Sequence, residues 1–171
     1  MKLIIVSDIH GSETAAKKAV ELYKKENCDY MLLLGDVLYH GPRNPLPEGH
    51  NPKGVAEALN SIKDRIIAVR GNCDAEIDQM LLEFPCMADY VMLVDGDKKL
   101  FLTHGHNYSP ENLPKLYGIS YFFSGHTHVS GISKTGDLTI CNPGSCALPK
   151  DGKAPSVAIY KNGELEIVYL K

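Results

Sequence analysis

Three short runs in the first half of the chain, residues 3–6, 30–34 and 66–69, are almost entirely apolar. Runs of this kind are typical of strands that are buried on both faces of a sheet. Between the first two, apolar residues recur at helical spacing among lysines and glutamates over residues 12–27, which predicts an amphipathic helix. Strand, helix and strand in this order predict a βαβ unit.

The segment that follows the second run cannot be regular structure. Residues 39–54 contain four prolines and three glycines, which predicts a long surface loop. Loops of this length are often functional. A helical pattern resumes over residues 55–62, and a short helix is predicted near residues 76–83.

From residue 90 onward, the pattern favours strands separated by short turns. Strands are predicted over residues 90–94 and 100–103, 121–124, 131–132 and 138–140, and on both sides of a turn at 161–164. A βαβ unit followed by hairpin signals predicts the α/β class, with two packed sheets and helices outside them. We expect one domain that spans residues 1–171, since this length suits a single core.

Composition narrows the function classes. The chain is 44% hydrophobic and 23% charged with a net charge of -3, so no nucleic-acid surface is expected. Apolar runs are too short for a membrane span or a signal peptide, so no membrane partner is expected. The five cysteines are odd in number and lack C-x-x-C spacing, which favours reduced thiols and a cytoplasmic location.

Residues that are able to bind metals follow apolar runs at five places in the chain. The five segments are Asp8-Ile9-His10, Gly35-Asp36, Asn72-Cys73-Asp74, His104-Gly105-His106 and His126-Thr127-His128. In an extended segment, residues i and i+2 point the same way, so each triplet can direct two side chains at one point. Ligands of α/β folds bind at the carboxyl ends of the strands, where we expect these segments to meet.

These segments supply oxygen and nitrogen ligands without thiolate. The candidate metal ligands are Asp8, His10, Asp36, Asn72, His104, His126 and His128. Such a set suits Mn²⁺, Fe²⁺, Zn²⁺ or Co²⁺, and it is too large for one ion, which predicts two divalent metal ions. Asp36 is the candidate bridging ligand, and a bridging hydroxide is the predicted nucleophile for attack on phosphorus. Two carboxylates against two dications leave the site positive, so a phosphate ester is the expected substrate.

The order D-x-H, G-D, G-N-x-D, H-G-H and G-H-T-H resembles the signature of the calcineurin-like metallophosphoesterases. The loop 41–49 and the segments 70–74 and 110–114 are similar to the YfcE-like group of bacterial phosphodiesterases. The resemblance implies an αββα sandwich of two mixed β-sheets, manganese-dependent hydrolysis of a small phosphodiester, and a homo-oligomer. Zn²⁺, Fe²⁺, Ni²⁺ and Co²⁺ are the alternative ions. By the same resemblance, one metal is held by Asp8, His10, Asp36 and His128, and the other by Asp36, Asn72, His104 and His126.

One position departs from this resemblance. Many members of the superfamily have a histidine after the asparagine that helps to protonate the leaving oxygen, and this chain has Cys73. A thiol is a weak hydrogen-bond donor and a poor acid for an oxygen leaving group. We therefore predict that aryl esters are cleaved much faster than alkyl esters. His106 is the alternative acid.

Several alternatives stay open at this stage. Arg43 is a candidate substrate-binding residue, because an arginine can bind phosphate bidentately, but it is equally an exposed loop residue. Asp74 is interpreted either as an acceptor behind a ligand histidine or as a helix cap. Asp36, Asn72 and His104 are the candidate catalytic residues. A phosphomonoesterase with the same centre, or a non-catalytic metal-binding scaffold, remains the alternative function.

Overall fold

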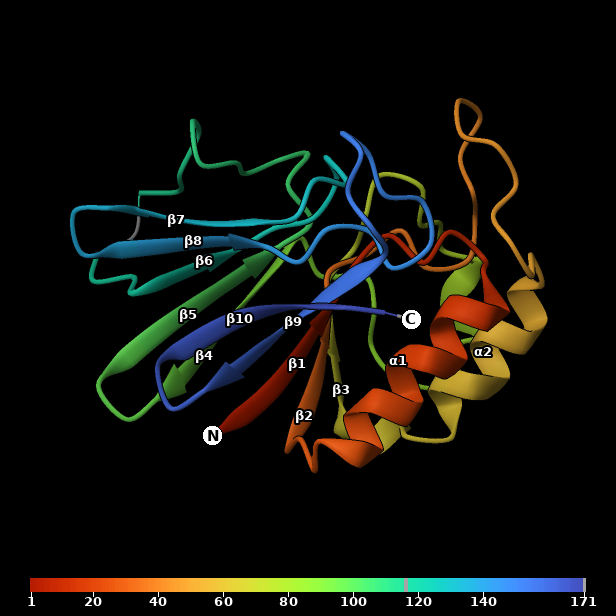
Figure 1. Cartoon of the computed structure of the whole chain (residues 1–171), viewed down its shortest axis with the longest axis horizontal. Helices are drawn as coiled ribbons and strands as arrows, with labels where there is room; N and C mark the ends of the chain where they lie inside the picture. Colours follow the sequence, from red (N-terminus) through yellow and green to blue (C-terminus); the bar gives the residue numbers. More distant parts are fainter. Residues whose placement is uncertain (116, 171) are drawn as a thin grey trace.

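The computed structural model describes residues 1–115 and 117–170, and these residues form two five-stranded sheets (Figure 1). The first sheet has the order β10-β9-β1-β2-β3 and contains β1 (Lys2–Val6), β2 (Tyr30–Leu33), β3 (Ile66–Ala68), β9 (Ser156–Lys161) and β10 (Glu164–Tyr169). The predicted βαβ unit is confirmed, because β1, β2 and β3 run parallel. Strand β9 is antiparallel to β1, which makes this sheet mixed.

The second sheet has the order β4-β5-β6-β8-β7. It contains β4 (Tyr90–Asp95), β5 (Lys98–Thr103), β6 (Tyr121–Phe123), β7 (Gly131–Thr135) and β8 (Leu138–Asn142). The predicted hairpins are β4–β5, β7–β8 and β9–β10. The sequence pattern around β6 suggested a hairpin strand, but β6 is parallel to both β5 and β8. Two mixed sheets confirm the predicted α/β sandwich.

The two α-helices, α1 (Glu13–Lys25) and α2 (Pro52–Asn60), both lie against the first sheet (Figure 1). The Ser12 hydroxyl caps α1 by accepting a hydrogen bond from the backbone N–H of Ala15 (3.2 Å). In the described residues both α-helices lie on the first sheet, and no α-helix packs on the outer face of the second sheet. No helix in this part of the chain is long and apolar enough to cross a membrane.

The helix predicted near residues 76–83 was also wrong in its extent. The structure has one short 3-10 helix there, η2 (Asp78–Met80), and another, η1 (Lys63–Arg65), before β3. The Gln79 side chain donates to the carbonyls of Leu82 (3.0 Å) and Phe84 (2.9 Å) and accepts from the N–H of Cys86 (3.0 Å). These side-chain bonds satisfy backbone groups that lie beyond the end of the 3-10 helix.

Strand β1 shows why its residues are apolar throughout. Leu3 and Ile5 face the second sheet, whereas Ile4 and Val6 face the helices, and all four are fully buried. Alternate residues of a strand point to opposite faces, so a central strand between two layers needs apolar residues at every position. Burial of each such side chain contributes about 1.5–3 kcal/mol. The central strands therefore form a rigid base for the loops at their carboxyl ends.

Candidate metal centre

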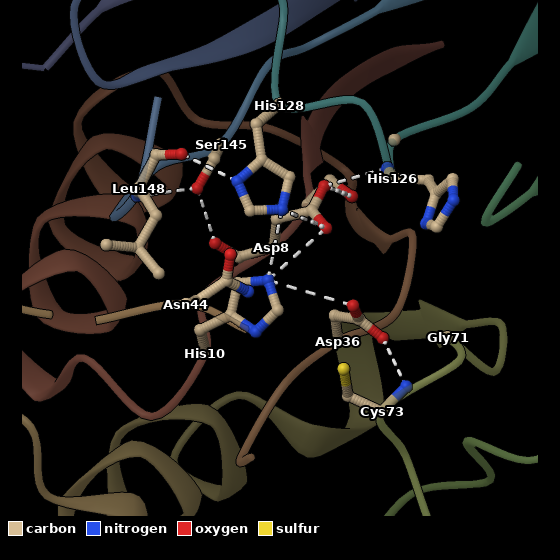
Figure 2. A network of polar contacts seen from close by, with 12 residues as sticks. Asp8, His10, Asp36, Asn44, Gly71, Cys73, His126, His128, Ser145 and Leu148 are labelled. Atoms are coloured by element: carbon tan, nitrogen blue, oxygen red, sulfur yellow. Dashed lines mark hydrogen bonds and ion pairs between the residues drawn. The ribbon is translucent and has the colours of Figure 1, made fainter. Parts of the chain in front are cut away.

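The loops at the carboxyl ends of five strands bring the candidate ligands together. Asp8 and His10 follow β1, Asp36 follows β2, Asn72 follows β3, His104 follows β5, and His126 and His128 follow β6. The buried members are Asp8, His10, Asp36, His104 and His128. Figure 2 shows the side chains of Asp8, His10, Asp36 and His128 pointing toward one another. These residues therefore lie together at one edge of the fold.

The backbone at five candidate ligands is in the left-handed region. The φ angles are 55° at Asp8, 50° at His10, 54° at Asp36, 67° at His126 and 62° at His128. Each such non-glycine residue costs about 1–3 kcal/mol, and residues of this kind cluster at functional sites. The surrounding main chain fixes the conformation, for example through the hydrogen bond from His10 N to Asp36 O (2.9 Å). The fold thus holds these side chains in place at a cost to its stability.

Three of the imidazoles are oriented by backbone carbonyls. Nδ1 bonds to a carbonyl oxygen in His10 (Tyr39 O, 2.9 Å), His104 (Leu34 O, 2.7 Å) and His128 (Leu148 O, 2.6 Å). A carbonyl oxygen only accepts, so each Nδ1 carries the proton. When such a ring is neutral, its Nε2 atom presents a lone pair to the centre, as in metal-binding histidines.

The carboxylate of Asp8 has one satisfied oxygen and one unsatisfied oxygen. Its Oδ2 accepts hydrogen bonds from the Ser7 hydroxyl (2.7 Å) and from the backbone N–H of His126 (3.0 Å). Its Oδ1 is buried without a hydrogen-bond partner and lies 3.3 Å from Nε2 of His128 and 3.6 Å from Nε2 of His10. A buried carboxylate oxygen without a partner is costly unless a cation balances it.

The two carboxylate oxygens of Asp36 have different neighbours. Its Oδ1 accepts a hydrogen bond from the backbone N–H of Cys73 (2.8 Å). Its Oδ2 lies 3.7 Å from Nε2 of His10 and 3.4 Å from Nε2 of His104. The amide oxygen of Asn72 is 3.1 Å from the same His104 nitrogen. One carboxylate oxygen of Asp36 thus lies near both the His10 and the His104 imidazoles.

The donor atoms fit divalent cations. Ligand atoms lie within 4.8 Å of one another in three groups, namely Asp8–His10–His128, Asp8–Asp36–His104 and His10–Asp36–Cys73. Oxygen and imidazole nitrogen together suit Mn²⁺, Fe²⁺, Co²⁺ or Zn²⁺. The first two groups share Asp8, and the last two share Asp36. The candidate ligand groups therefore overlap in one continuous site.

His126 is placed differently from the other ligand candidates. Its ring lies beside His104, with centroids 5.1 Å apart, and Figure 2 shows it turned to one side of the Asp8–His10–His128 group. The ring of His106 lies 5.4 Å from that of His104 and 6.4 Å from that of His126. Burial and the nearby charge of His104 lower the pKa values of both His106 and His126. The lowered pKa values favour the uncharged form of both rings, which lie beside the buried centre.

The buried groups are strongly charged in the metal-free protein. Burial opposes ionisation of Asp8 and Asp36, but hydrogen bonds and charges from the histidines hold both pKa values below the usual range. Burial likewise opposes the charge on His104, yet the hydrogen bond to Asp36 and the charges of Asp8 and Asp36 raise its pKa to about 9. A proton on His104 thus balances the carboxylates where a cation would otherwise do so.

Comparison with known proteins agrees with this geometry. Residues 1–164 match the calcineurin-like phosphoesterase superfamily domain. The chain belongs to this superfamily. It is 46% identical over 170 residues to phosphodiesterase YfcE of Escherichia coli strain K12, covering 99% of this chain and 92% of that protein. The solved structure of YfcE, described as a phosphoesterase, superposes with a TM-score of 0.96 at 45% identity, covering 99% of this chain and 93% of that one.

A more distant neighbour shares the fold alone. Vacuolar protein sorting 29 from Cryptosporidium parvum superposes on this phosphoesterase with a TM-score of 0.65 at 17% identity, covering 98% of this chain and 95% of that one. At this identity, the likeness concerns the sandwich and not the chemistry.

The loop of Asp36 in this phosphoesterase is supported by Asp74. The Asp74 carboxylate accepts hydrogen bonds from the backbone N–H groups of Asp36 (2.8 Å), Val37 (2.8 Å) and Gly71 (2.7 Å). Neither sequence interpretation of Asp74 described this role, because it holds the main chain of the ligand loops and contacts no ligand histidine. Its partners are backbone groups, which have no signature in the sequence.

An open cleft of about 780 Å³ adjoins the candidate centre of the phosphoesterase. Its lining includes Asp36, Asn72 and His128, together with Arg43 and Asn44 of the proline-rich loop. Lys150 also lines the cleft, and sequence reasoning missed it because nothing near it resembles a motif. Its backbone N–H donates to the carbonyl of His128 (3.1 Å), which ties it to a ligand loop. The cleft thus adds two cationic side chains to the site.

Proposed function

We propose that this calcineurin-like phosphoesterase hydrolyses phosphodiester bonds at a centre of two divalent cations, with Mn²⁺ as the favoured ion. The observation that carries the proposal is the convergence of the Asp8 and Asp36 carboxylates with the Nε2 atoms of His10, His104 and His128. The 46% identity to a protein named as a phosphodiesterase supports the choice of diester as substrate.

The ligands would divide between the two ions around Asp36. Asp8, His10, Asp36 and His128 would hold one ion, while Asp36, Asn72, His104 and His126 would hold the other. When bound, two such cations lower the pKa of a water to supply hydroxide as the nucleophile and neutralise charge on the phosphoryl oxygens. No hydrogen bond among the described residues holds the half-buried ring of His126, so this ring is free to rotate. Rotation toward His104 would complete the second set of ligands.

The chain's own residues would bind and orient the substrate. Asn72 is exposed at the cleft, where, among the described residues, its amide N–H donates only to the weak acceptor Sγ of Cys73 (3.3 Å). It is therefore available to donate to a phosphoryl oxygen. Arg43 and Lys150 line the same cleft, and their charges would attract an anionic diester from solution.

A metal-readdition assay tests the proposal. The purified protein is stripped with a chelator, reloaded with each divalent metal, and assayed with bis(4-nitrophenyl) phosphate and with 4-nitrophenyl phosphate. We expect turnover of the diester to return with Mn²⁺ and to exceed that of the monoester. Metal binding without turnover of either ester would instead support a scaffold, and a strong preference for the monoester would support a phosphomonoesterase.

Two aspartate variants make the assay specific to the centre. Asp36→Asn removes the bridging charge and is expected to lower diester turnover at least about 1,000-fold, equivalent to about 4 kcal/mol. Asp95→Asn is the matched control, because Asp95 accepts a hydrogen bond from Tyr160 (2.8 Å) beside the amino-terminal end of β1, away from the site. We expect the control to retain full activity.

A further inference from the structure

A second, apolar groove adjoins the catalytic cleft. It encloses about 330 Å³, and its lining includes Leu38, Tyr39, Pro52, Cys73, Ile77 and Leu81. These residues come from the loop after β2, the start of α2, the loop after β3, and the segment around η2. The candidate metal ligands take no part in this lining, so the catalytic centre alone does not account for the groove.

The groove is continuous with the cleft. Tyr39, Cys73 and Ala75 line both of them. The sulfur of Cys73 lies within 4.8 Å of ligand atoms of His10 and Asp36, and Figure 2 shows it pointing toward these two side chains. A group that leaves the metal centre past Cys73 would therefore enter the groove directly.

The groove is chemically different from the cleft. Ile77 is 60% exposed, Leu81 is 47% exposed and Tyr39 is 46% exposed, although each has a large apolar surface. The one carboxylate among the described lining residues, that of Asp78, accepts a hydrogen bond from the N–H of Ala75 (2.9 Å). Exposed apolar side chains gathered at a hollow are typical of ligand sites.

We propose that this groove binds an apolar ester substituent of the phosphodiester, such as an aromatic ring or a short alkyl chain. The inference rests on the proposed function, because the centre would hold the phosphate while the groove holds the substituent. The substrate class is then an anionic phosphodiester with at least one apolar ester group. Ile77 and Leu81 would determine specificity without touching the reacting atoms.

Phosphonates test this inference, since their P–C bonds survive hydrolysis. Binding of methyl-, butyl- and phenylphosphonate to the full-length, Mn²⁺-loaded protein is measured by isothermal titration calorimetry. Each methylene removed from water increases affinity about fourfold, so butylphosphonate should bind at least about tenfold more tightly than methylphosphonate, even with partial burial. Phenylphosphonate should show a similar gain.

Variants on the same short segment provide the control. Ile77→Ser and Leu81→Ser should remove most of the gain for butyl- and phenylphosphonate and leave methylphosphonate affinity unchanged. Met80→Ser should change nothing, because Met80 is 80% exposed on η2 and does not line the groove. All three positions are exposed, so the variants should fold.

The outcomes separate the inference from the proposed function. Tight methylphosphonate binding with no gain for the larger groups would overturn the groove's role and leave the phosphoesterase centre intact. Failure of every phosphonate to bind would overturn both. If Ile77→Ser converted an oligomer into monomers without affecting phosphonates, the groove would be a contact between copies of the chain, which also overturns the inference.

Discussion

The Nε2 atoms of His10 and His128 face each other at 3.2 Å in the buried centre. Each ring donates its Nδ1 proton to a backbone carbonyl, so two neutral rings would place two lone pairs against each other. A proton or a metal ion is needed between them. Because the unpartnered Oδ1 of Asp8 lies beside both nitrogens, the site is built for a cation.

Metal binding should release protons. Burial lowers the pKa of His10, but the nearby carboxylates raise it, and the net effect is an increase. In the metal-free protein, the pKa of His104 is raised to about 9. His104 is therefore protonated below about pH 9, and a cation must displace that proton. Between pH 6.5 and 9, Mn²⁺ affinity should rise up to about tenfold per pH unit for each proton released.

Calorimetric titration in buffers with different ionisation enthalpies measures this release. The stability of the metal-free protein should show the opposite trend, because the charged His104 stabilises the fold below about pH 6.5 and this contribution is lost as pH rises through about 9. The increase in melting temperature on addition of Mn²⁺ should therefore grow over the same pH range. Binding without proton release at pH 7 would contradict this account of the centre.

Asp74 should affect both stability and metal affinity. Asp74→Ala leaves three backbone N–H groups in the ligand loops without their acceptor, which should lower the free energy of unfolding by about 3 kcal/mol. Mn²⁺ affinity should fall about 10- to 100-fold, since the loop of Asp36 is no longer fixed. Asp74→Asn retains one acceptor oxygen, so its free energy of unfolding and its Mn²⁺ affinity should lie between those of Asp74→Ala and the unmodified protein. Unchanged urea unfolding of Asp74→Ala would show that the carboxylate does not support the loop.

Gly71 should not tolerate a side chain. A Cβ atom added to Gly71 would overlap the carboxylate of Asp36, so Gly71→Ala should displace this ligand and lower metal content and diester turnover together. Gly131→Ala is the matched control, because a Cβ atom there meets nothing within 4 Å. Elemental analysis of both purified variants provides the measurement. Equal metal content in the two would contradict the central position of Asp36.

Cys73 should limit which esters react quickly. Burial, followed by the charge of Asp36, raises the pKa of its thiol to about 12, so the group is a poor acid for a leaving oxygen. Diester rates should therefore fall steeply as the pKa of the leaving alcohol rises. Cys73→His should flatten this dependence by supplying a general acid, whereas Cys73→Ser should leave it steep. A flat dependence in the unmodified protein would refute the role assigned to Cys73.

Much of the fold was predictable because its central strands are buried on both faces. The apolar run of β1 could not be a half-exposed strand, and the lysine and glutamate pattern of α1 defined a surface helix. The segment around η2 could not be predicted in the same way. The Gln79 side chain bonds there to backbone groups up to seven residues away in the chain, and such contacts have no signature in the sequence.

The candidate site was predictable in its residue types but not in its orientation. Asp8 and His128 stand out because they follow apolar runs in characteristic triplets. The backbone carbonyls of Tyr39, Leu34 and Leu148, which fix the imidazole rings, have no such signal, because every residue carries a carbonyl. Lys150 reaches the cleft only through the folded path of the chain, so it too required the structure.

The most direct test of the account is the stoichiometry of metal reactivation. Stripped protein is titrated with Mn²⁺ while bound metal and turnover of bis(4-nitrophenyl) phosphate are measured on the same samples. The account predicts that activity reaches its maximum at two bound Mn²⁺ per chain and that Asp36→Asn binds fewer ions and stays inactive. Full activity at one ion per chain, or undiminished activity of Asp36→Asn, would contradict it.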